Sequence, residues 1–322
     1  MAQIYEALTY SLLQPKIDDK GKALALRLPQ IFERLVRFGV PLEIIDGDTA
    51  NIPRSWVKAV LSELENQLGD KKMFILSVLG IQSSGKSTLL NTMFGIEFPV
   101  GAGRCTRGIF MQLISLAVDS EYDYMLIMDT EDSLRQSYTM TNLTVIITFV
   151  LGLGDITIIN IKGESSNEMK DVLQIAVEAF LRLKLAQKSV HLRQSCIFAH
   201  QNISTGERNN SRLQQQLLNQ LDEITKEAAQ NENIYDIFSF DDIIEFEFEK
   251  DIWIFSDVSV GSPLMAPRNP DYIKTALKLK ESVILKAVQL NHTSSFSGIA
   301  SKIDDLWKAI LTDDSVFRFR NS

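Results

Sequence analysis

The chain has 322 residues, of which 45% are hydrophobic and 23% are charged. This length and apolar content are enough for one large α/β core, or for one core with a smaller helical appendage. The net charge is −8, which excludes a global positive field that would attract nucleic acid or anionic lipid.

Cysteine usage and the N-terminus indicate a cellular compartment. The two cysteines, Cys105 and Cys196, lie far apart and predict no disulfide framework, which is typical of a reducing compartment. The first residues, MAQIYEALTY, lack the basic region and long apolar run of a secretory signal. The most apolar stretch, 143–161, is interrupted by two glycines and an aspartate, so we expect no transmembrane segment. We therefore expect a cytoplasmic protein that could also enter the nucleus.

The first part of the chain predicts a few separate elements. Residues 1–26 are polar and weakly patterned, and we interpret them as a lead-in with a bend. The pattern then predicts a helix at 30–38, a short strand at 42–45 and a second helix at 54–68. We expect the region 1–70 to be a helical lead-in that packs on the main core.

From residue 73 onward, apolar strands alternate with amphipathic helices. This alternation is typical of an α/β fold with an open, mostly parallel sheet and helices on both faces. Strands are predicted at 73–79, 110–118, 124–128, 157–161, 195–199 and 252–256. Helices are predicted at 87–94, 168–184, 213–224, 272–290 and 297–311. We expect the core to span 71–270, followed by C-terminal helices at 271–322.

One loop carries the strongest chemical pattern. The segment GIQSSGKST at 80–88 fits the phosphate-binding P-loop, G-x-x-x-x-G-K-[ST], between a predicted strand and a predicted helix. Its glycines let backbone N–H groups converge on a phosphate chain. Lys86 would contact the β- and γ-phosphates, and the Ser87 hydroxyl would bind Mg²⁺. The residues expected to bind a nucleotide are Gly80, Gln82, Ser83, Ser84, Gly85, Lys86, Ser87 and Thr88.

A P-loop protein also needs a carboxylate for its Mg²⁺ shell. Asp129 follows the predicted strand at 124–128, at the place in the chain order where such an aspartate normally stands. A strand-end turn or a helix cap is the alternative role for Asp129. Because a P-loop and an apolar strand precede it, we favour the metal role.

The glycine-rich basic loop at 101–108 suggests further site residues. In GTPases a loop at this point supplies a threonine that completes the Mg²⁺ shell, and Thr106 is the candidate here. Arg104 or Arg107 could neutralise charge in the transition state. Two solvated arginines in a flexible loop are an equally good interpretation of these positions.

The residues do not decide which base is bound. Guanine-specific proteins usually carry Asn-Lys-x-Asp after a late strand, whose carboxylate accepts hydrogen bonds from guanine. Here the predicted strand at 195–199 is followed by His200, Gln201 and Asn202. The amides of Gln201 and Asn202 offer donors and acceptors but no carboxylate. From this chemistry alone, GTP and ATP both stay open.

Five longer segments match a known family. They are 76–95 (LSVLGIQSSGKSTLLNTMFG), 101–113 (GAGRCTRGIFMQL), 151–164 (LGLGDITIINIKGE), 198–204 (FAHQNIS) and 263–272 (PLMAPRNPDY). Together they resemble the G domain of the very large inducible GTPases, a branch of the dynamin-related large GTPases. The resemblance implies GTP or GDP with Mg²⁺ as ligands, with Gln201 and Asn202 standing where Asn-Lys-x-Asp would be. It also implies that a homodimer could form through the G domain.

The same resemblance bears on hydrolysis. It implies that Gln82 and Ser83 position the attacking water and contact the β–γ bridging oxygen, so these residues and Arg104 are the catalytic candidates. One departure concerns Asp132, which stands where the family has a glycine whose N–H meets the γ-phosphate. A like-charge pair at ~4 Å and an effective dielectric of ~20 is unfavourable by about 4 kcal/mol.

Two hypotheses follow from these residues. The first is a slow Mg²⁺-dependent GTPase that hydrolyses GTP to GDP and phosphate. The second is a catalytically impaired pseudo-GTPase that acts as a nucleotide-bound interaction module. The charge at Asp132 separates the two hypotheses.

Overall fold

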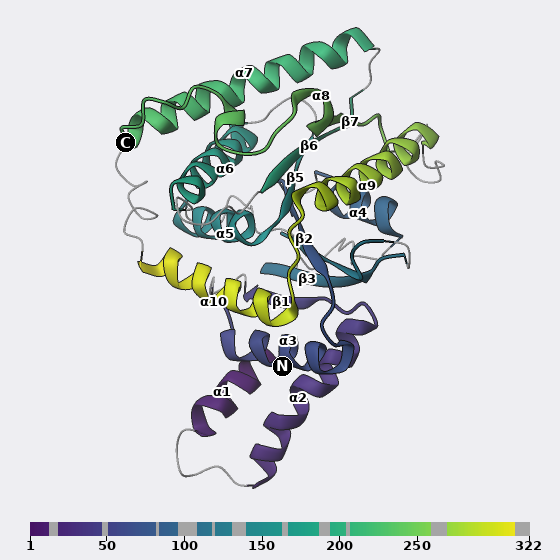
Figure 1. Ribbon diagram of the computed structural model, residues 1–322, viewed down its shortest axis with the longest axis vertical. Helices are drawn as coiled ribbons and strands as arrows, with labels where there is room; N and C mark the ends of the chain where they lie inside the picture. The colour runs from purple at the N-terminus through teal and green to yellow at the C-terminus, as the bar shows by residue number, and fades with distance from the viewer. Residues whose placement is uncertain are drawn as a thin grey trace. The chain divides into compact units, whose positions relative to one another are not determined.

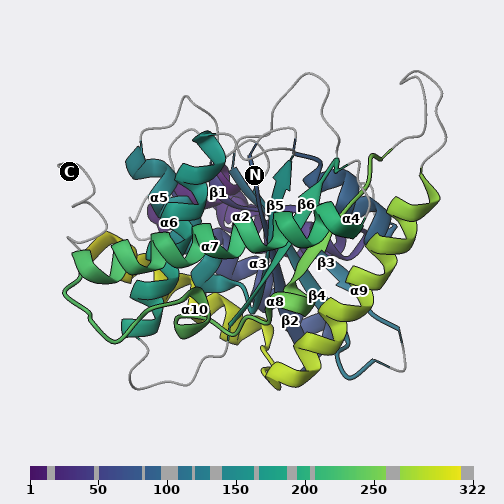
Figure 2. The same ribbon diagram turned by 90° about the horizontal axis from the view of Figure 1, so that it is seen from above.

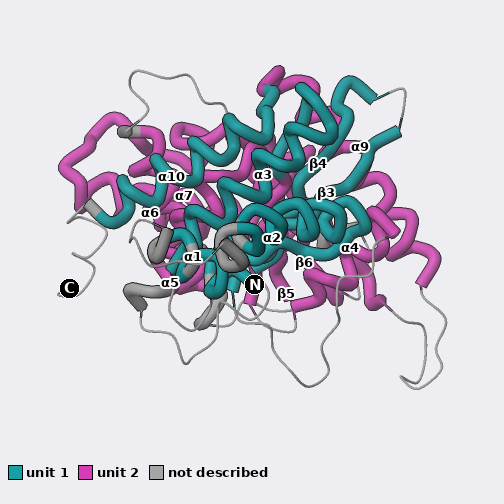
Figure 3. Tube along the Cα trace, turned by 90° about the horizontal axis from the view of Figure 1, so that it is seen from below, with its two compact units in different colours: residues 1–75, 106–133, 293–322 teal, residues 76–105, 134–292 magenta. Residues whose placement is uncertain are grey.

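The structure is a computed structural model that describes residues 1–12, 19–46, 51–81, 84–95, 108–117, 120–130, 140–162, 167–186, 194–203, 207–258 and 269–312. The chain divides into two compact units that alternate along the sequence (Figure 3). Unit 1 comprises 1–75, 106–133 and 293–322, and unit 2 comprises 76–105 and 134–292. Each unit is built from separate stretches of the chain, so it does not test a division into consecutive parts. The predicted division into 1–70, 71–270 and 271–322 therefore stays a prediction.

Unit 2 contains a parallel sheet. Its strands pair in the order β2 (Met73–Leu79, in this unit from Leu76), β5 (Ile156–Lys162), β6 (Ser195–Gln201) and β7 (Ile252–Ile254). Every residue of β2 and β6 is buried. Strands that are buried on both faces are typical of a parallel sheet covered by helices on either side.

The helices of unit 2 form two groups. They are α4 (Lys86–Phe94), α5 (Met140–Leu153), α6 (Asn167–Ala186), α7 (Glu207–Asn231), α8 (Phe248–Asp251) and α9 (Pro270–Leu290), with a short 3₁₀ helix, η1 (Phe240–Asp242). Helix α6 packs between α5 and α7, and α4 packs on α9. Figures 1 and 2 show α5 and α6 on one side of β5 and β6, with α4 and α9 on the other. The predicted α/β fold with helices on both faces is therefore confirmed.

Unit 1 has an antiparallel sheet and a helical layer. Its elements are α1 (Ala2–Leu12), α2 (Asp19–Arg37), β1 (Leu42–Asp46), α3 (Arg54–Leu68), β3 (Gly108–Ser115), β4 (Tyr124–Asp129) and α10 (Phe296–Thr312). Strand β3 pairs antiparallel with both β1 and β4. Helix α3 packs on α1, α2 and α10. Among the described helices of the chain, none is long and apolar enough to cross a membrane.

No separate helix was predicted within residues 1–26, but helices cover most of the described part of that segment. Helix α1 covers Ala2–Leu12, and α2 begins at Asp19 and runs through Pro29, well before the helix start predicted at residue 30. The ring of Trp56 on α3 lies 5.3 Å from that of Tyr5 and 5.2 Å from that of Phe32. Such packing stabilises helices whose own sequence pattern is weak.

Candidate nucleotide site

The P-loop joins β2 to α4 in unit 2, and its second glycine has a left-handed backbone. Gly85 precedes α4 with φ of 91°. A residue with a Cβ loses roughly 1–2 kcal/mol in that conformation. Glycine also has no side chain to cap α4, so the first N–H groups of the helix can serve an anionic ligand.

The first glycine of the loop is required by crowding. The register of β2 and β5 pairs Leu79 with Ile159, so the next residues along, Gly80 and Asn160, lie close together. A Cβ at Gly80 would come within 2.5 Å of the Asn160 carbonyl oxygen. Only glycine therefore fits at the point where the chain leaves the sheet.

The lysine of the motif lies inside the loop. Lys86 is 5% exposed, and its Nζ donates to the carbonyl oxygens of Gly80 at 2.8 Å and Ile81 at 3.2 Å. The ammonium is thus held beside the backbone that would surround a phosphate. A phosphate oxygen is a stronger acceptor than a carbonyl for such a cation, so a ligand can replace these contacts.

A buried amide network lies beneath the loop. Asn160 Nδ2 donates to the Ser84 carbonyl oxygen at 2.8 Å and to Ser84 Oγ at 3.0 Å. Gln201 Nε2 donates to Asn160 Oδ1 at 2.9 Å. We call Ser84, Asn160 and Gln201 the amide network; their exposed fractions are 2%, 0% and 1%. It connects the P-loop to the end of β6.

Asn202 follows the network on the surface. Strand β6 extends through Gln201, two residues beyond the predicted end, and Asn202 then takes a left-handed backbone with φ of 60°. The N–H of Ile203 donates to the Phe255 carbonyl at 2.9 Å, and that of Phe255 donates to the His200 carbonyl at 2.8 Å. These bonds fix the segment on which the exposed Asn202 amide is presented.

The remaining predicted site residues are placed less fully. Asp129 ends β4 in unit 1 and is 1% exposed. Ser87 lies in the first turn of α4 and is partly exposed. A hydroxyl and a carboxylate are oxygen donors of the kind Mg²⁺ prefers, so these two residues fit that ion chemically. Six other residues that the sequence analysis names lie outside the described ranges, namely Gln82, Ser83, Arg104, Thr106, Arg107 and Asp132.

Sequence reasoning missed Asn160. The residue is an amide that follows two isoleucines in the mostly apolar strand ITIINIK, and that contrast is the signal that could have found it. Buried polar side chains in folded proteins are hydrogen-bonded, so an amide at this position requires polar partners nearby. The identity of those partners depends on the strand register.

A separate cavity of about 420 Å³ lies between α3 and α10 in unit 1. Serines 55, 62, 297 and 301 line it together with Arg54, Lys58 and Asp304. Arg54 is paired with Asp304 at 2.8 Å, so its charge is already compensated. The cavity lacks the glycine loop that suits a phosphate chain, and it is a weaker candidate for the nucleotide.

The parallel strands of unit 2, the glycine loop and the helix that begins at Lys86 define a P-loop protein of the α/β class. A family model described as the URGCP-like GTPase domain matches residues 1–273. The chain belongs to this family of GTPase domains.

The similar proteins include much longer ones. Human interferon-induced very large GTPase 1 is 37% identical over 333 residues, which cover 100% of this chain and 13% of that protein. The bovine protein named up-regulator of cell proliferation is 32% identical over 300 residues, covering 88% of this chain and 31% of that protein. The chain therefore spans only part of the length of these relatives. The identity over the full chain confirms the resemblance to the very large inducible GTPases.

Proposed function

We propose that this chain is a G domain that binds GTP with Mg²⁺ and hydrolyses it slowly to GDP and phosphate. The observation that carries the proposal is the position of the Lys86 ammonium, which lies against the loop carbonyls at the entry to α4. The family match and the relatives named as GTPases support guanine rather than adenine as the base.

Each part of the nucleotide has proposed partners. Lys86 and the first N–H groups of α4 hold the phosphates. The lysine carries a full positive charge, and the N–H groups carry a partial positive charge at the start of the helix. The exposed amide of Asn202 contacts the base, with Gln201 behind it. Bound Mg²⁺ would neutralise charge on the phosphate oxygens. Its proposed ligands are Ser87, Thr106 and Asp129.

Hydrolysis is assigned to the residues that the family resemblance indicates. Gln82 and Ser83 are proposed to orient the attacking water, and Arg104 to compensate charge that develops in the transition state. These roles depend on the order of the motif along the chain.

A pseudo-GTPase is the second candidate function, and Asp132 is the observation that favours it. Its carboxylate stands where the family has a glycine beside the γ-phosphate. Negative charge at that position opposes the charge of the phosphate and slows turnover without removing Lys86 or the loop glycines. In that case the bound nucleotide would keep the domain folded for contact with a partner.

Self-association through the G domain and a location in the cytoplasm or nucleus also belong to the proposal. The resemblance to dynamin-related GTPases supports the first, and the absence of a disulfide framework in the cysteine pattern supports the second. Light scattering with GDP and with a GTP analogue would test for a nucleotide-dependent dimer.

The test is a side-by-side calorimetric titration of MgGTP and MgATP. We expect GTP to bind at least about tenfold more tightly, which corresponds to ~1.4 kcal/mol. Lys86→Ala should weaken GTP by roughly 10- to 100-fold, the effect of losing a charge-assisted hydrogen bond. Lys58→Ala, an exposed lysine of α3, is the matched control and should change nothing. Equal affinities for GTP and ATP, or no binding of either, would overturn the proposal.

A further inference from the structure

Asn160 lies where strand pairing brings three distant segments together. It pairs with Ala199 in the register of β5 and β6, and Gln201 lies two residues further along β6. Residues two apart on a strand point to the same face, so the Gln201 amide is on the same side as that of Asn160. The register of β2 and β5 places Gly80 beside Asn160 on its other flank. The amide network is therefore a consequence of the sheet.

We propose that Asn160 is a positioning residue of the nucleotide site, through which Gln201 on the base side sets the shape of the phosphate loop. The proposal rests on the proposed function, since it concerns the same site. Asn160 contacts Ser84 and the strand residues around it, and it acts on the phosphates through the loop. Gln201 reaches the loop only through Asn160 in the contacts of the described residues.

The direction of the hydrogen bonds supports this role. Asn160 uses Nδ2 to donate to both oxygens of Ser84 and uses Oδ1 to accept from Gln201. Because Ser84 Oγ accepts from Asn160, its own proton stays available to an acceptor such as a phosphate oxygen. Removing Gln201 would leave Asn160 Oδ1 buried without this donor, which costs more than the bond alone. The amide of Asn160 could then turn and lose its hold on Ser84.

The neutrality of the network also suits an anion site. A carboxylate at residue 160 or 201 would lie beneath the loop and repel phosphate, whereas an amide orients the loop at no charge. A Cβ at Gly80 would come within 2.5 Å of the Asn160 carbonyl oxygen, so the loop backbone lies directly against residue 160. The loop shape is thus sensitive to the orientation of one buried amide.

Inorganic tripolyphosphate tests the proposal because it has phosphates and no base. With the full chain, calorimetry would compare Mg-tripolyphosphate and MgGTP binding to the wild type, Gln201→Ala and Asn160→Ala. We expect Gln201→Ala to weaken both ligands by about three- to tenfold and Asn160→Ala by about tenfold, as for one or two buried hydrogen bonds. We expect the double variant to bind no more weakly than Asn160→Ala, since the two residues act in series.

Two outcomes would overturn the inference. In one, Gln201→Ala weakens GTP but leaves tripolyphosphate unchanged, as it would if Gln201 only contacted the base. In the other, the effects of the two substitutions add independently. A wild-type protein that does not bind GTP would instead overturn the proposed function itself. If Asn160→Ala does not fold, the affinities of Gln201→Ala and Gln201→Glu for tripolyphosphate and for GTP still show whether Gln201 acts only on the base.

Gln194 provides a matched control at the other end of β6. Its Nε2 donates to the carbonyl oxygens of Leu151 at 2.8 Å and Gly154 at 3.0 Å, away from the P-loop. Gln194→Ala should lower the melting temperature and leave the affinity for tripolyphosphate unchanged. A loss of affinity in this variant equal to that of Gln201→Ala would show a general loss of packing and contradict the proposed role.

Discussion

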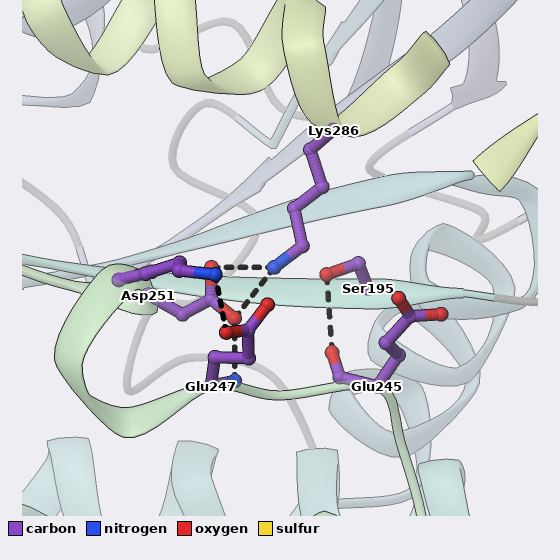
Figure 4. Close-up of polar contacts among 6 residues, drawn as sticks. Ser195, Glu245, Glu247, Asp251 and Lys286 are labelled. Atoms are coloured by element: carbon purple, nitrogen blue, oxygen red, sulfur yellow. Dashed lines mark hydrogen bonds and ion pairs between the residues drawn. The ribbon is translucent and has the colours of Figure 1, made fainter. Parts of the chain in front are cut away.

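Two of the buried polar clusters among the described residues of unit 2 differ in charge. The amide network at the P-loop is neutral, whereas an ion pair joins Asp251 of α8 to Lys286 of α9 (Figure 4). Lys286 Nζ lies 2.5 Å from Asp251 Oδ1, and Asp251 Oδ2 also accepts from the N–H of Glu247 at 2.7 Å. The side chains of the pair are 10% and 1% exposed.

This difference in charge distinguishes a ligand site from a contact that only stabilises the fold. Neutral amides orient a loop that must receive an anion, and they leave the local charge to Lys86. The ion pair compensates its own charge and holds α9 to α8. Burial raises the pKa of the Asp251 carboxyl, and the Lys286 ammonium opposes part of that rise. Burial also raises the pKa of the nearby Cys196 thiol well above its usual value, so this cysteine is a packing residue rather than a nucleophile.

The largest effect is expected from breaking the ion pair. Lys286→Met leaves Asp251 buried without its cation and should lower the free energy of unfolding by about 3–5 kcal/mol. Urea denaturation measures this, with Lys278→Met, an exposed lysine of α9, expected within about 0.5 kcal/mol of the wild type. Where the variant is folded, its affinity for GTP should be unchanged. A large loss of affinity would mean that the two clusters are not separate in function.

The loss of stability in Lys286→Met should depend on pH. The folded-state pKa of Asp251 is raised above its unfolded value, so this carboxyl favours the folded state in acid. That contribution is lost as the pH rises through the folded pKa. The deficit of Lys286→Met should therefore be small below about pH 4, near the unfolded-state pKa of aspartate, and grow toward neutrality. A deficit that is constant with pH would show that lost packing, rather than charge, causes it.

A smaller effect is expected at Asp132, where a carboxylate stands in place of the family's glycine. Asp132→Gly should raise the rate of GTP hydrolysis by about three- to tenfold, measured as phosphate release in a single turnover. Asp132→Asn removes the charge and keeps the size, so it separates charge from backbone freedom. If neither variant changes the rate, the charge argument is wrong and the slow step lies elsewhere.

The sequence predicted the parts of this site that are contiguous. The P-loop motif, the strand before it and the helix after it are local patterns, and β2 and α4 are confirmed close to the predicted bounds. The amide network was not predicted, because it joins residues 84, 160 and 201 through the registers of two strand pairs. The ion pair was missed for the same reason, since α8 has only 4 residues and its partner lies on another helix.

The central claim is that the nucleotide binds at the P-loop of unit 2. Amide hydrogen exchange of the full chain with and without MgGDP tests it most directly. We expect slower exchange in the segments 80–95 and 195–203, and no change along α3 and α10. Protection confined to the cavity between α3 and α10, or protection in Lys86→Ala equal to that of the wild type at a subsaturating concentration of MgGDP, would contradict it.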